Sequence, residues 1–324
     1  MFASFLASAT TAWALVSVRT PRAPRRLVAR DAALDLAASE ELFASYYDQA
    51  PEPQRSTYAK AWSIVEATFA AAGGDAMALD ASAFGGALAS FTTPGPSEAQ
   101  LEAMPAEAAA IMRKLSDTAA SYYRVTSPDL DWGTCYRTLN REVGARLWPS
   151  ARTDVPNLTL YFGSGSPANP DELFMRLECV PRRDVAVDAA YAEAYYAPFT
   201  STCLELMTGD DRFRPYVSDS PYARGCLAPS GVRVFFDGAD QCADGDALAR
   251  AEAAALELGG LWRDQLAAAA PLDAEASAAM AARDAKIRRV AADSSPDNAN
   301  RALVYGDDLF AQTKDLLAGA AGAL

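Results

Sequence analysis

The sequence predicts an α/β fold, a three-layer α/β/α sandwich with a central antiparallel sheet. Three observations predict it. Segments with strand-like patterns gather between residues 131 and 237, a single helical segment at 188–208 interrupts them, and further helical segments precede and follow the series. Strands that follow one another directly favour antiparallel pairing, because parallel pairs need a long crossover. The helices before and after the series supply the two outer layers.

The first outer layer is expected from helices ahead of the strands. Its clearest member is 56–72, where four apolar residues recur with a helical period and a Gly-Gly pair follows: Tyr58, Trp62, Val65 and Phe69. Other helical segments expected here are 39–49, a segment that starts at Ser97, and one from Pro105 to about Ala120. Residues 73–96 are rich in Gly, Ala and Pro and are expected to be an insertion.

The central sheet is expected from six short segments. They are 131–137, 142–148, 157–163, 172–180, 223–228 and 231–237, and Gly163 to Ser166 is expected to be a hairpin loop. In 172–180 apolar residues alternate with others, so that Arg176 and Glu178 share one face of a central strand. Burying charge is unfavourable unless it is paired or used, so this pair of residues indicates a polar site.

The remaining helices carry clear boundary signals. Asp188 stands at the N-cap position of the helix at 188–208, and Tyr191 and Tyr195 follow on one stripe. After the sheet, helices are expected over 244–270, 274–292 and 307–319. No linker divides the chain, so residues 31–324 are expected to form a single domain.

Composition excludes several functional classes. The chain has no histidine, which removes the usual general base and the commonest zinc ligand. Its five cysteines are far apart and include no C-x-x-C pair, so we expect no metal centre or iron–sulfur cluster. A formal net charge of −13 argues against nucleic-acid binding, which depends on neutralising phosphates. Nucleotide-binding and hydrolase motifs are missing as well.

Residues 1–30 differ from the rest of the chain. The stretch to Val18 is apolar and rich in small residues, five arginines follow, and the first acidic residue is Asp31. An Arg-rich leader without acidic residues is typical of an organelle transit peptide. We therefore expect 1–30 to be a plastid-targeting leader, whose apolar part is compatible with a separate signal sequence in a two-stage leader. The apolar run is short for a membrane anchor, so no stable membrane insertion is expected. Without the five arginines the formal net charge is −18 instead of −13.

Three segments resemble one known family in order and in approximate spacing. They are PRRDVAVDAAYAEAYY (181–196), PYVSDSPYARGCLAPSG (215–231) and ARDAKIRR (282–289). Together they resemble red chlorophyll catabolite reductase, a relative of the ferredoxin-dependent bilin reductases, over roughly 127–320. The resemblance implies a reductase of an open-chain tetrapyrrole that binds no redox cofactor and receives its electrons from reduced ferredoxin.

The resemblance also implies where protons are supplied to the substrate. The family has a glutamate on the strand that follows a Pro-Asn pair, but this chain has Tyr161 at that position. Tyrosine is the weaker acid at neutral pH, so Glu178 on the neighbouring strand is a second candidate. The alternative for Glu178 is a simple ion pair with Arg176. The family's second acid, an aspartate, falls near Ser295, and we assign it to Asp297 because Ser295-Pro296 resembles a one-residue insertion.

Further positions are expected to contact substrate or partner. Leu227 matches a pocket position that influences product stereochemistry in the family, with an ordinary core leucine as the alternative, and Arg176 and Asp293 are the other expected substrate contacts. A basic helix side is expected to dock the acidic ferredoxin, unless it is only a solvated face, through Arg283, Lys286 and Arg289. Arg182 and Arg183 add a second basic spot.

The expected function is therefore reduction of red chlorophyll catabolite to a primary fluorescent catabolite in the chloroplast stroma. Two alternatives stay open for a tetrapyrrole protein: a bilin reductase, and a non-catalytic binder that sequesters the pigment. The tyrosine in place of the family glutamate favours the binder. An unrelated α/β domain that only echoes the family is the remaining alternative.

Overall fold

The structure is a computed structural model that describes eleven stretches of the chain. They are residues 54–73, 78–80, 90–93, 98–102, 118–138, 142–166, 169–218, 220–225, 228–237, 246–295 and 298–319. The described strands form one antiparallel sheet in the order β1-β3-β4-β5-β6-β7-β9-β8, and β2 pairs with β3 beside β1.

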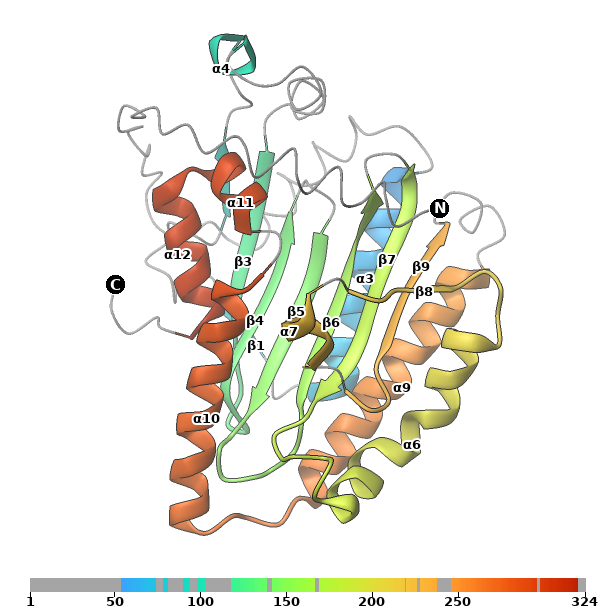
Figure 1. Ribbon diagram of the computed structural model, residues 1–324, viewed down its shortest axis with the longest axis vertical. Helices are drawn as coiled ribbons and strands as arrows, with labels where there is room; N and C mark the ends of the chain where they lie inside the picture. Colours follow the sequence, from blue (N-terminus) through green and yellow to red (C-terminus); the bar gives the residue numbers. More distant parts are fainter. Residues whose placement is uncertain are drawn as a thin grey trace.

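Strands β4 to β7 form the long middle of this sheet (Figure 1). The strand bounds are β1 Ala78–Asp80, β2 Ser90–Thr93, β3 Thr118–Thr126, β4 Leu130–Thr138, β5 Glu142–Pro149, β6 Asn157–Ser166, β7 Asn169–Val180, β8 Arg214–Pro215 and β9 Val232–Asp237. Consecutive strands from β3 to β7 are neighbours, as expected for an antiparallel meander.

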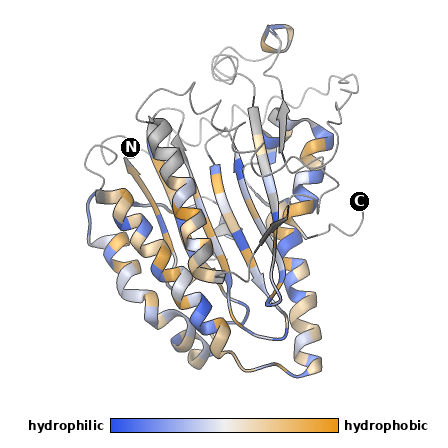
Figure 2. Ribbon diagram, turned by 180° about the vertical axis from the view of Figure 1, so that it is seen from behind, coloured by the Kyte–Doolittle hydropathy of each residue, from blue (hydrophilic) through white to orange (hydrophobic). Residues whose placement is uncertain are grey.

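Helices cover both faces of the sheet, which confirms the three-layer α/β/α sandwich (Figures 1 and 2). The helix bounds are α3 Gln54–Gly73, α4 Glu98–Glu102, α6 Ala189–Thr208, α7 Pro221–Gly225, α9 Asp246–Ala268, α10 Ala274–Asp293, α11 Asn298–Tyr305 and α12 Asp307–Leu317. Helices α3, α6 and α9 lie on one face, and α10, α11 and α12 lie on the other, which we call the C-terminal face.

The larger core lies between the sheet and helices α3, α6 and α9. Apolar residues at alternate strand positions, such as Leu147, Leu160 and Met175, point into it, and Trp262 of α9 is fully buried there. The Trp262 indole N–H donates to the Pro156 carbonyl over 2.8 Å, so the largest core side chain is also satisfied. Helices α3 and α9 pack so closely that a Cβ on Gly259 would lie 2.9 Å from the Thr68 carbonyl oxygen.

A smaller core lies under the C-terminal helices. It joins large side chains of β3, β4 and β5 to α11 and α12, among them Tyr122, Tyr136, Trp148, Tyr305 and Leu316. An ion pair of 3.0 Å between Arg301 of α11 and Glu142 of β5 also connects the two layers. Because these buried contacts involve β3 to β5, the C-terminal helices cover mainly that half of the face. At the other end β8 pairs with β9, and α7 lies in front of the middle strands in Figure 1.

The structure corrects four predictions of local structure. Residues 223–225 of the expected strand 223–228 belong to helix α7. The expected helix that ends near Ala120 is wrong at its end, because β3 begins at Thr118 and pairs with β4. Gly163 to Ser166 continues β6, where Ser166 pairs with Asn169, so it is not a hairpin loop. The expected insertion at 73–96 contributes β1 and β2.

Two predictions about the N-terminal region stay untested. The leader at 1–30 and the helix at 39–49 lie outside the described residues, and so does the boundary at residue 31. Among the helices that the structure describes, none has an apolar stretch long enough to cross a lipid bilayer.

Candidate functional site

The C-terminal face of the sheet carries a row of side chains that crosses six strands. Strand pairing places Tyr122, Tyr136, Gly144, Tyr161, Arg176 and Arg233 side by side on β3, β4, β5, β6, β7 and β9. Side chains alternate between the faces of a strand, so residues in register on antiparallel strands share a face. We call this set the tyrosine–arginine row. It contains two residues predicted from the sequence, Tyr161 and Arg176, directly opposite each other.

Tyr161 lies along its own strand, over a glycine. A Cβ on Gly163 would lie 2.5 Å from the Tyr161 hydroxyl oxygen, so only glycine leaves room for the ring there. The Tyr161 ring also contacts the Phe174 ring, with 5.8 Å between centroids. Tyr161 is therefore positioned by packing, half-buried, on the partly covered part of the face.

Several aromatic rings gather around Phe174, and Tyr161 is one of them. Phe174 of β7, Phe235 of β9 and Tyr216 after β8 lie with ring centroids 5.2 to 5.3 Å apart in each pair. All three rings are half-buried instead of enclosed in the core. We call Tyr161, Phe174, Tyr216 and Phe235 the aromatic cluster. Such a surface suits a flat, conjugated ligand, because aromatic rings contribute large apolar area and favour stacked or edge contacts.

Glu178 is fully buried near the end of β7 and accepts hydrogen bonds from two arginines. Arg233 Nη2 donates to both carboxylate oxygens, over 3.0 Å and 2.9 Å, and Arg176 Nε donates to one of them. Burial lowers the pKa of Arg233, and the neighbouring Glu178 opposes that shift. The ion pair with Arg176 that the sequence left open is therefore present, and it is extended by Arg233. This pairing is the physical reason why charge is tolerated on this strand.

Arg146 lies in the next row of the same face and was missed by the sequence analysis. Its strand neighbours are Thr134 on β4 and Thr159 on β6, so no carboxylate stands beside it. Within the described residues Arg146 makes no hydrogen bond and no ion pair. Burial lowers its pKa. A signal was present in the sequence, because Arg146 alternates with the apolar residues Val143, Ala145 and Leu147.

Asp293, one of the two acidic residues expected from the C-terminal part, has its described partner outside this site. Asp293 ends helix α10 and pairs with Lys314 of α12 over 3.0 Å, and the described contacts include none between Asp293 and Tyr161 or Glu178. Asp297 and Leu227 lie outside the described residues, so their roles stay predictions.

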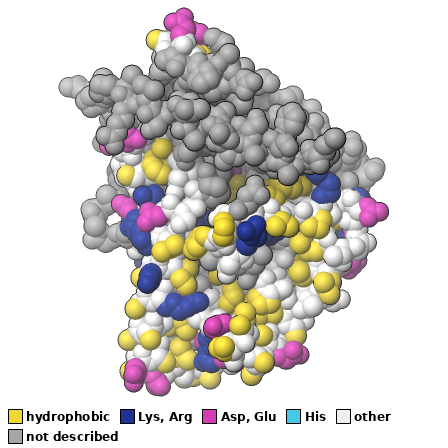
Figure 3. Space-filling model, viewed as in Figure 1, with side chains coloured by type: hydrophobic (Ala, Val, Ile, Leu, Met, Phe, Trp, Pro, Cys, Tyr) yellow, Lys and Arg dark blue, Asp and Glu magenta, His cyan; other side chains and the backbone are white. Residues whose placement is uncertain are grey.

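The expected ferredoxin-docking residues lie on α10, and two of the three already have partners. Arg283 donates to the Pro181 carbonyl over 3.0 Å, and Arg289 pairs with Asp315 over 2.9 Å. Lys286 is exposed and forms no ion pair within the part of the chain that the structure describes. Figure 3 shows basic side chains over α10 and α12 on this side of the molecule.

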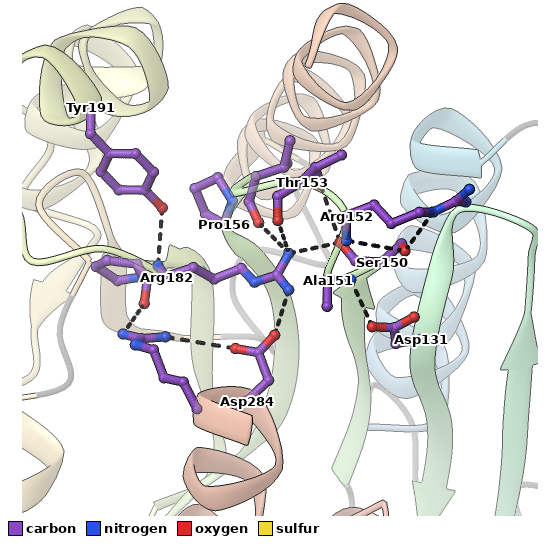
Figure 4. A network of polar contacts seen from close by, with 12 residues as sticks. Asp131, Ser150, Ala151, Arg152, Thr153, Pro156, Arg182, Tyr191 and Asp284 are labelled. Atoms are coloured by element: carbon purple, nitrogen blue, oxygen red, sulfur yellow. Dashed lines mark hydrogen bonds and ion pairs between the residues drawn. The ribbon is translucent and has the colours of Figure 1, made fainter. Parts of the chain in front are cut away.

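Arg182 is not part of a basic surface, in contrast to the prediction. Its guanidinium is buried and donates to three backbone carbonyls, those of Ser150, Thr153 and Val155, over 2.9 to 3.3 Å. It also pairs with Asp284 of α10, as Figure 4 shows. Burial raises the pKa of Asp284, and Arg182 opposes that shift. These hydrogen bonds and the ion pair of Arg182 connect α10 to the loop after β5.

Comparisons with known proteins agree with the resemblance found in the sequence. The sequence model of the red chlorophyll catabolite reductase family, RCC reductase, matches residues 146–300. A red chlorophyll catabolite reductase from Hordeum vulgare is 29% identical over 89 residues, which cover 27% of this chain and 42% of that protein. The matched part thus spans less than half of the relative's length. The resemblance to this family is confirmed over these residues.

A solved structure shares the fold. The crystal structure of selenomethionine-labelled phytochromobilin synthase from tomato, in complex with biliverdin, aligns with a TM-score of 0.50 and 12% identity. The alignment covers 64% of this chain and 71% of the tomato chain. At this identity the likeness concerns the fold of the sheet and its helices.

Proposed function

We propose, from the match to the red chlorophyll catabolite reductase family over residues 146–300, that this chain reduces an open-chain tetrapyrrole with electrons from reduced ferredoxin. The substrate we propose is red chlorophyll catabolite, and the product is a primary fluorescent catabolite. The reaction adds two electrons, one at a time, and two protons to the conjugated system. Because the pigment itself accepts the electrons, the protein needs to hold it and to supply protons.

The observation that carries this proposal is that the aromatic cluster and the arginines lie next to each other on one face of the sheet. The C-terminal helices cover that face only in part. A linear tetrapyrrole is a flat conjugated chain with carboxylate side groups. The aromatic cluster offers stacking surface, and the arginines next to it offer positive charge on a protein whose formal net charge is −13. The conjugated chain and the carboxylates of the ligand thus each have matching side chains on neighbouring strands.

The proposed roles follow from the contacts of each residue. Tyr161 contacts Phe174 within the aromatic cluster and stands opposite Arg176, so its hydroxyl is the proposed proton donor at the pigment. Both oxygens of Glu178 accept guanidinium hydrogen bonds, so we propose that Glu178 acts as a positioning residue for Arg176 and Arg233. Asp297 remains the proposed second acid. It precedes α11, whose Arg301 pairs with Glu142 of β5.

An assay with ferredoxin, its reductase, NADPH and red chlorophyll catabolite tests this function. We expect a fluorescent product with the native chain and a strong loss of rate in Tyr161→Phe, which keeps the ring and removes the hydroxyl. Biliverdin in the same assay tests the alternative of a bilin reductase, for which an absorbance shift on turnover would be the sign. Absence of product from both pigments would contradict a reductase.

A non-catalytic tetrapyrrole binder is the second candidate function. It is favoured by one observation, that Tyr161 stands where the family has a glutamate while Glu178 is bound to two arginines. The variant Tyr161→Glu separates the two functions. If the protein is a binder, the variant consumes no electrons and binds the pigment with unchanged affinity. If it is a reductase whose rate is limited by the weak acidity of tyrosine, the variant reduces the pigment faster than the native chain.

We also propose that the protein acts in the plastid stroma, on the basis of the Arg-rich leader at 1–30. N-terminal sequencing of the protein isolated from plastids tests it. A start close to residue 31 is expected, and a chain that retains the leader would contradict the proposal.

A further inference from the structure

Arg146 differs from three other arginines of the C-terminal face, which each have a carboxylate partner. Arg176 and Arg233 are bonded to Glu178, and Arg301 is bonded to Glu142. Within the described residues Arg146 has neither a hydrogen bond nor an ion pair. Its side chain is half-buried, so the guanidinium has hydrogen-bond donors that a carboxylate of a ligand could use.

The direct neighbours of Arg146 in its own row are polar and uncharged. Thr134 and Thr159 flank it on the neighbouring strands, and one strand further on either side follow Arg124 and Glu178. That glutamate is already bound by two arginines. The Arg146 charge is therefore not neutralised by a direct neighbour, and it stands in the centre of the sheet between the smaller core and the aromatic cluster.

A protonated phenol lies close to the same position. Tyr136 pairs with Gly144, two residues before Arg146 on β5, and a Cβ on Gly144 would lie 3.1 Å from the Tyr136 hydroxyl oxygen. Burial raises the pKa of Tyr136 to about 12, while Arg146 acts in the opposite direction. The hydroxyl is thus a proton-carrying donor at neutral pH. A guanidinium and a neutral phenol next to each other both donate hydrogen bonds, which suits a carboxylate.

We propose that Arg146 binds a carboxylate group of the ligand, with the Tyr136 hydroxyl as a second donor. This inference rests on the proposed function and adds to it which side group fixes the pigment on the sheet. Arg176 then stays paired with Glu178. Arg146, and not Arg176 as predicted from the sequence, contacts the anionic group of the ligand. A ligand anchored here would extend from the centre of the sheet toward Tyr161 and the aromatic cluster.

Titration with biliverdin and with its dimethyl ester tests this inference without any turnover. The two pigments share the conjugated chain, but the ester lacks the carboxylate charges. We expect the native chain to bind biliverdin at least tenfold more tightly than the ester, and Arg146→Gln to lose that preference while it keeps its affinity for the ester. Tenfold corresponds to about 1.4 kcal/mol. Arg146→Lys, which retains charge but not the forked geometry, should lose part of the preference.

Arg263→Gln is the matched control. Arg263 lies on α9, on the opposite side of the sheet, and its described ion pair is with the adjacent Asp264, so the variant changes net charge equally without touching the face. It should bind both pigments as the native chain does. Equal affinity of native chain and Arg146→Gln for biliverdin would overturn the role of Arg146 and leave the proposed function standing. Failure of the native chain to bind either pigment would overturn this inference, while the proposed function is decided separately by turnover of red chlorophyll catabolite.

The comparison of acid and ester with the native chain needs no variant. If the native chain binds the ester as tightly as biliverdin, the proposal is wrong even if Arg146→Gln does not fold. We expect the variant to fold, with a melting temperature equal to or above that of the native chain, because it removes a charge that has no partner.

Discussion

Arg182 Nη2 lies 2.5 Å from Asp284 Oδ2, and the two residues are 102 positions apart in the sequence. Both side chains are buried, and the same guanidinium also satisfies three carbonyls of the loop after β5. The pair therefore connects the ends of β5 and β7 to α10, the first helix of the C-terminal layer.

Removing one member of this pair should strongly destabilise the protein. Arg182→Met leaves a buried carboxylate and three carbonyls without their donor, so we expect a loss of roughly 3–5 kcal/mol in the free energy of unfolding. Urea denaturation measures it. Arg183→Met is the control, since Arg183 is largely exposed and its ion pairs with Asp154 and Asp188 should contribute at most about 1 kcal/mol. Equal losses in the two variants would contradict the role assigned to Arg182.

A methyl group on Gly163 should displace Tyr161. The added Cβ would lie 2.5 Å from the Tyr161 hydroxyl, so Gly163→Ala is expected to lower turnover roughly ten- to hundredfold while the chain stays folded. Gly260→Ala on α9 is the control, because a Cβ there meets nothing within 4 Å. The rate with red chlorophyll catabolite checks this prediction. Native rates in both variants would show that the position of Tyr161 is irrelevant to the reaction.

Lys286 should contribute to ferredoxin binding more than its basic neighbours on α10. Arg283 and Arg289 already have partners, whereas Lys286 is exposed and has none among the described residues. Lys286→Glu is therefore expected to raise the KM for ferredoxin several-fold at low salt, with an unchanged melting temperature, and the difference should fade as salt rises. Arg263→Glu, on the other side of the sheet, serves as control. An unchanged KM for Lys286→Glu would place ferredoxin elsewhere.

Asp210 should stabilise the fold in a pH-dependent way. Hydrogen bonds from Arg212 lower the pKa of Asp210 from its ordinary 3.8 to about 2, with Arg250 as a further partner. An acid whose pKa is lower in the folded chain stabilises that chain above pH 3.8 and loses this effect as the pH falls toward 2. Asp210→Asn should thus be less stable than the native chain at pH 7, by a margin that shrinks below pH 4. A margin that is constant down to pH 3 would contradict it.

The fold was predictable where local patterns and long-range packing agree. Strands with a period of two, such as 172–180, and helices with a clear cap, such as Asp188, are present as expected. The cap is made as predicted, because the Tyr191 amide donates to the Asp188 carboxylate over 2.9 Å. The errors occur where pairing overrides propensity. Ala119 and Ala120 favour a helix on their own, but β3 pairs there with β2 and β4.

The candidate site was predictable only in part. Tyr161, Arg176 and Glu178 share a face because of strand alternation, which the sequence reveals. The partner of Glu178 is Arg233, 55 positions away, and no local pattern identifies such a contact. The absence of a partner for Arg146 is equally invisible in the sequence, since it depends on which side chains the register brings beside it. Helix α11 was missed because it has only eight residues.

The central claim is that this chain transfers electrons to a tetrapyrrole instead of only holding it. The most direct measurement is an anaerobic single turnover with reduced ferredoxin and bound red chlorophyll catabolite, in which ferredoxin oxidation and product fluorescence are followed together. We predict that two ferredoxins are oxidised for each fluorescent product molecule that forms. A pigment that stays bound and unchanged while ferredoxin remains reduced would contradict the claim.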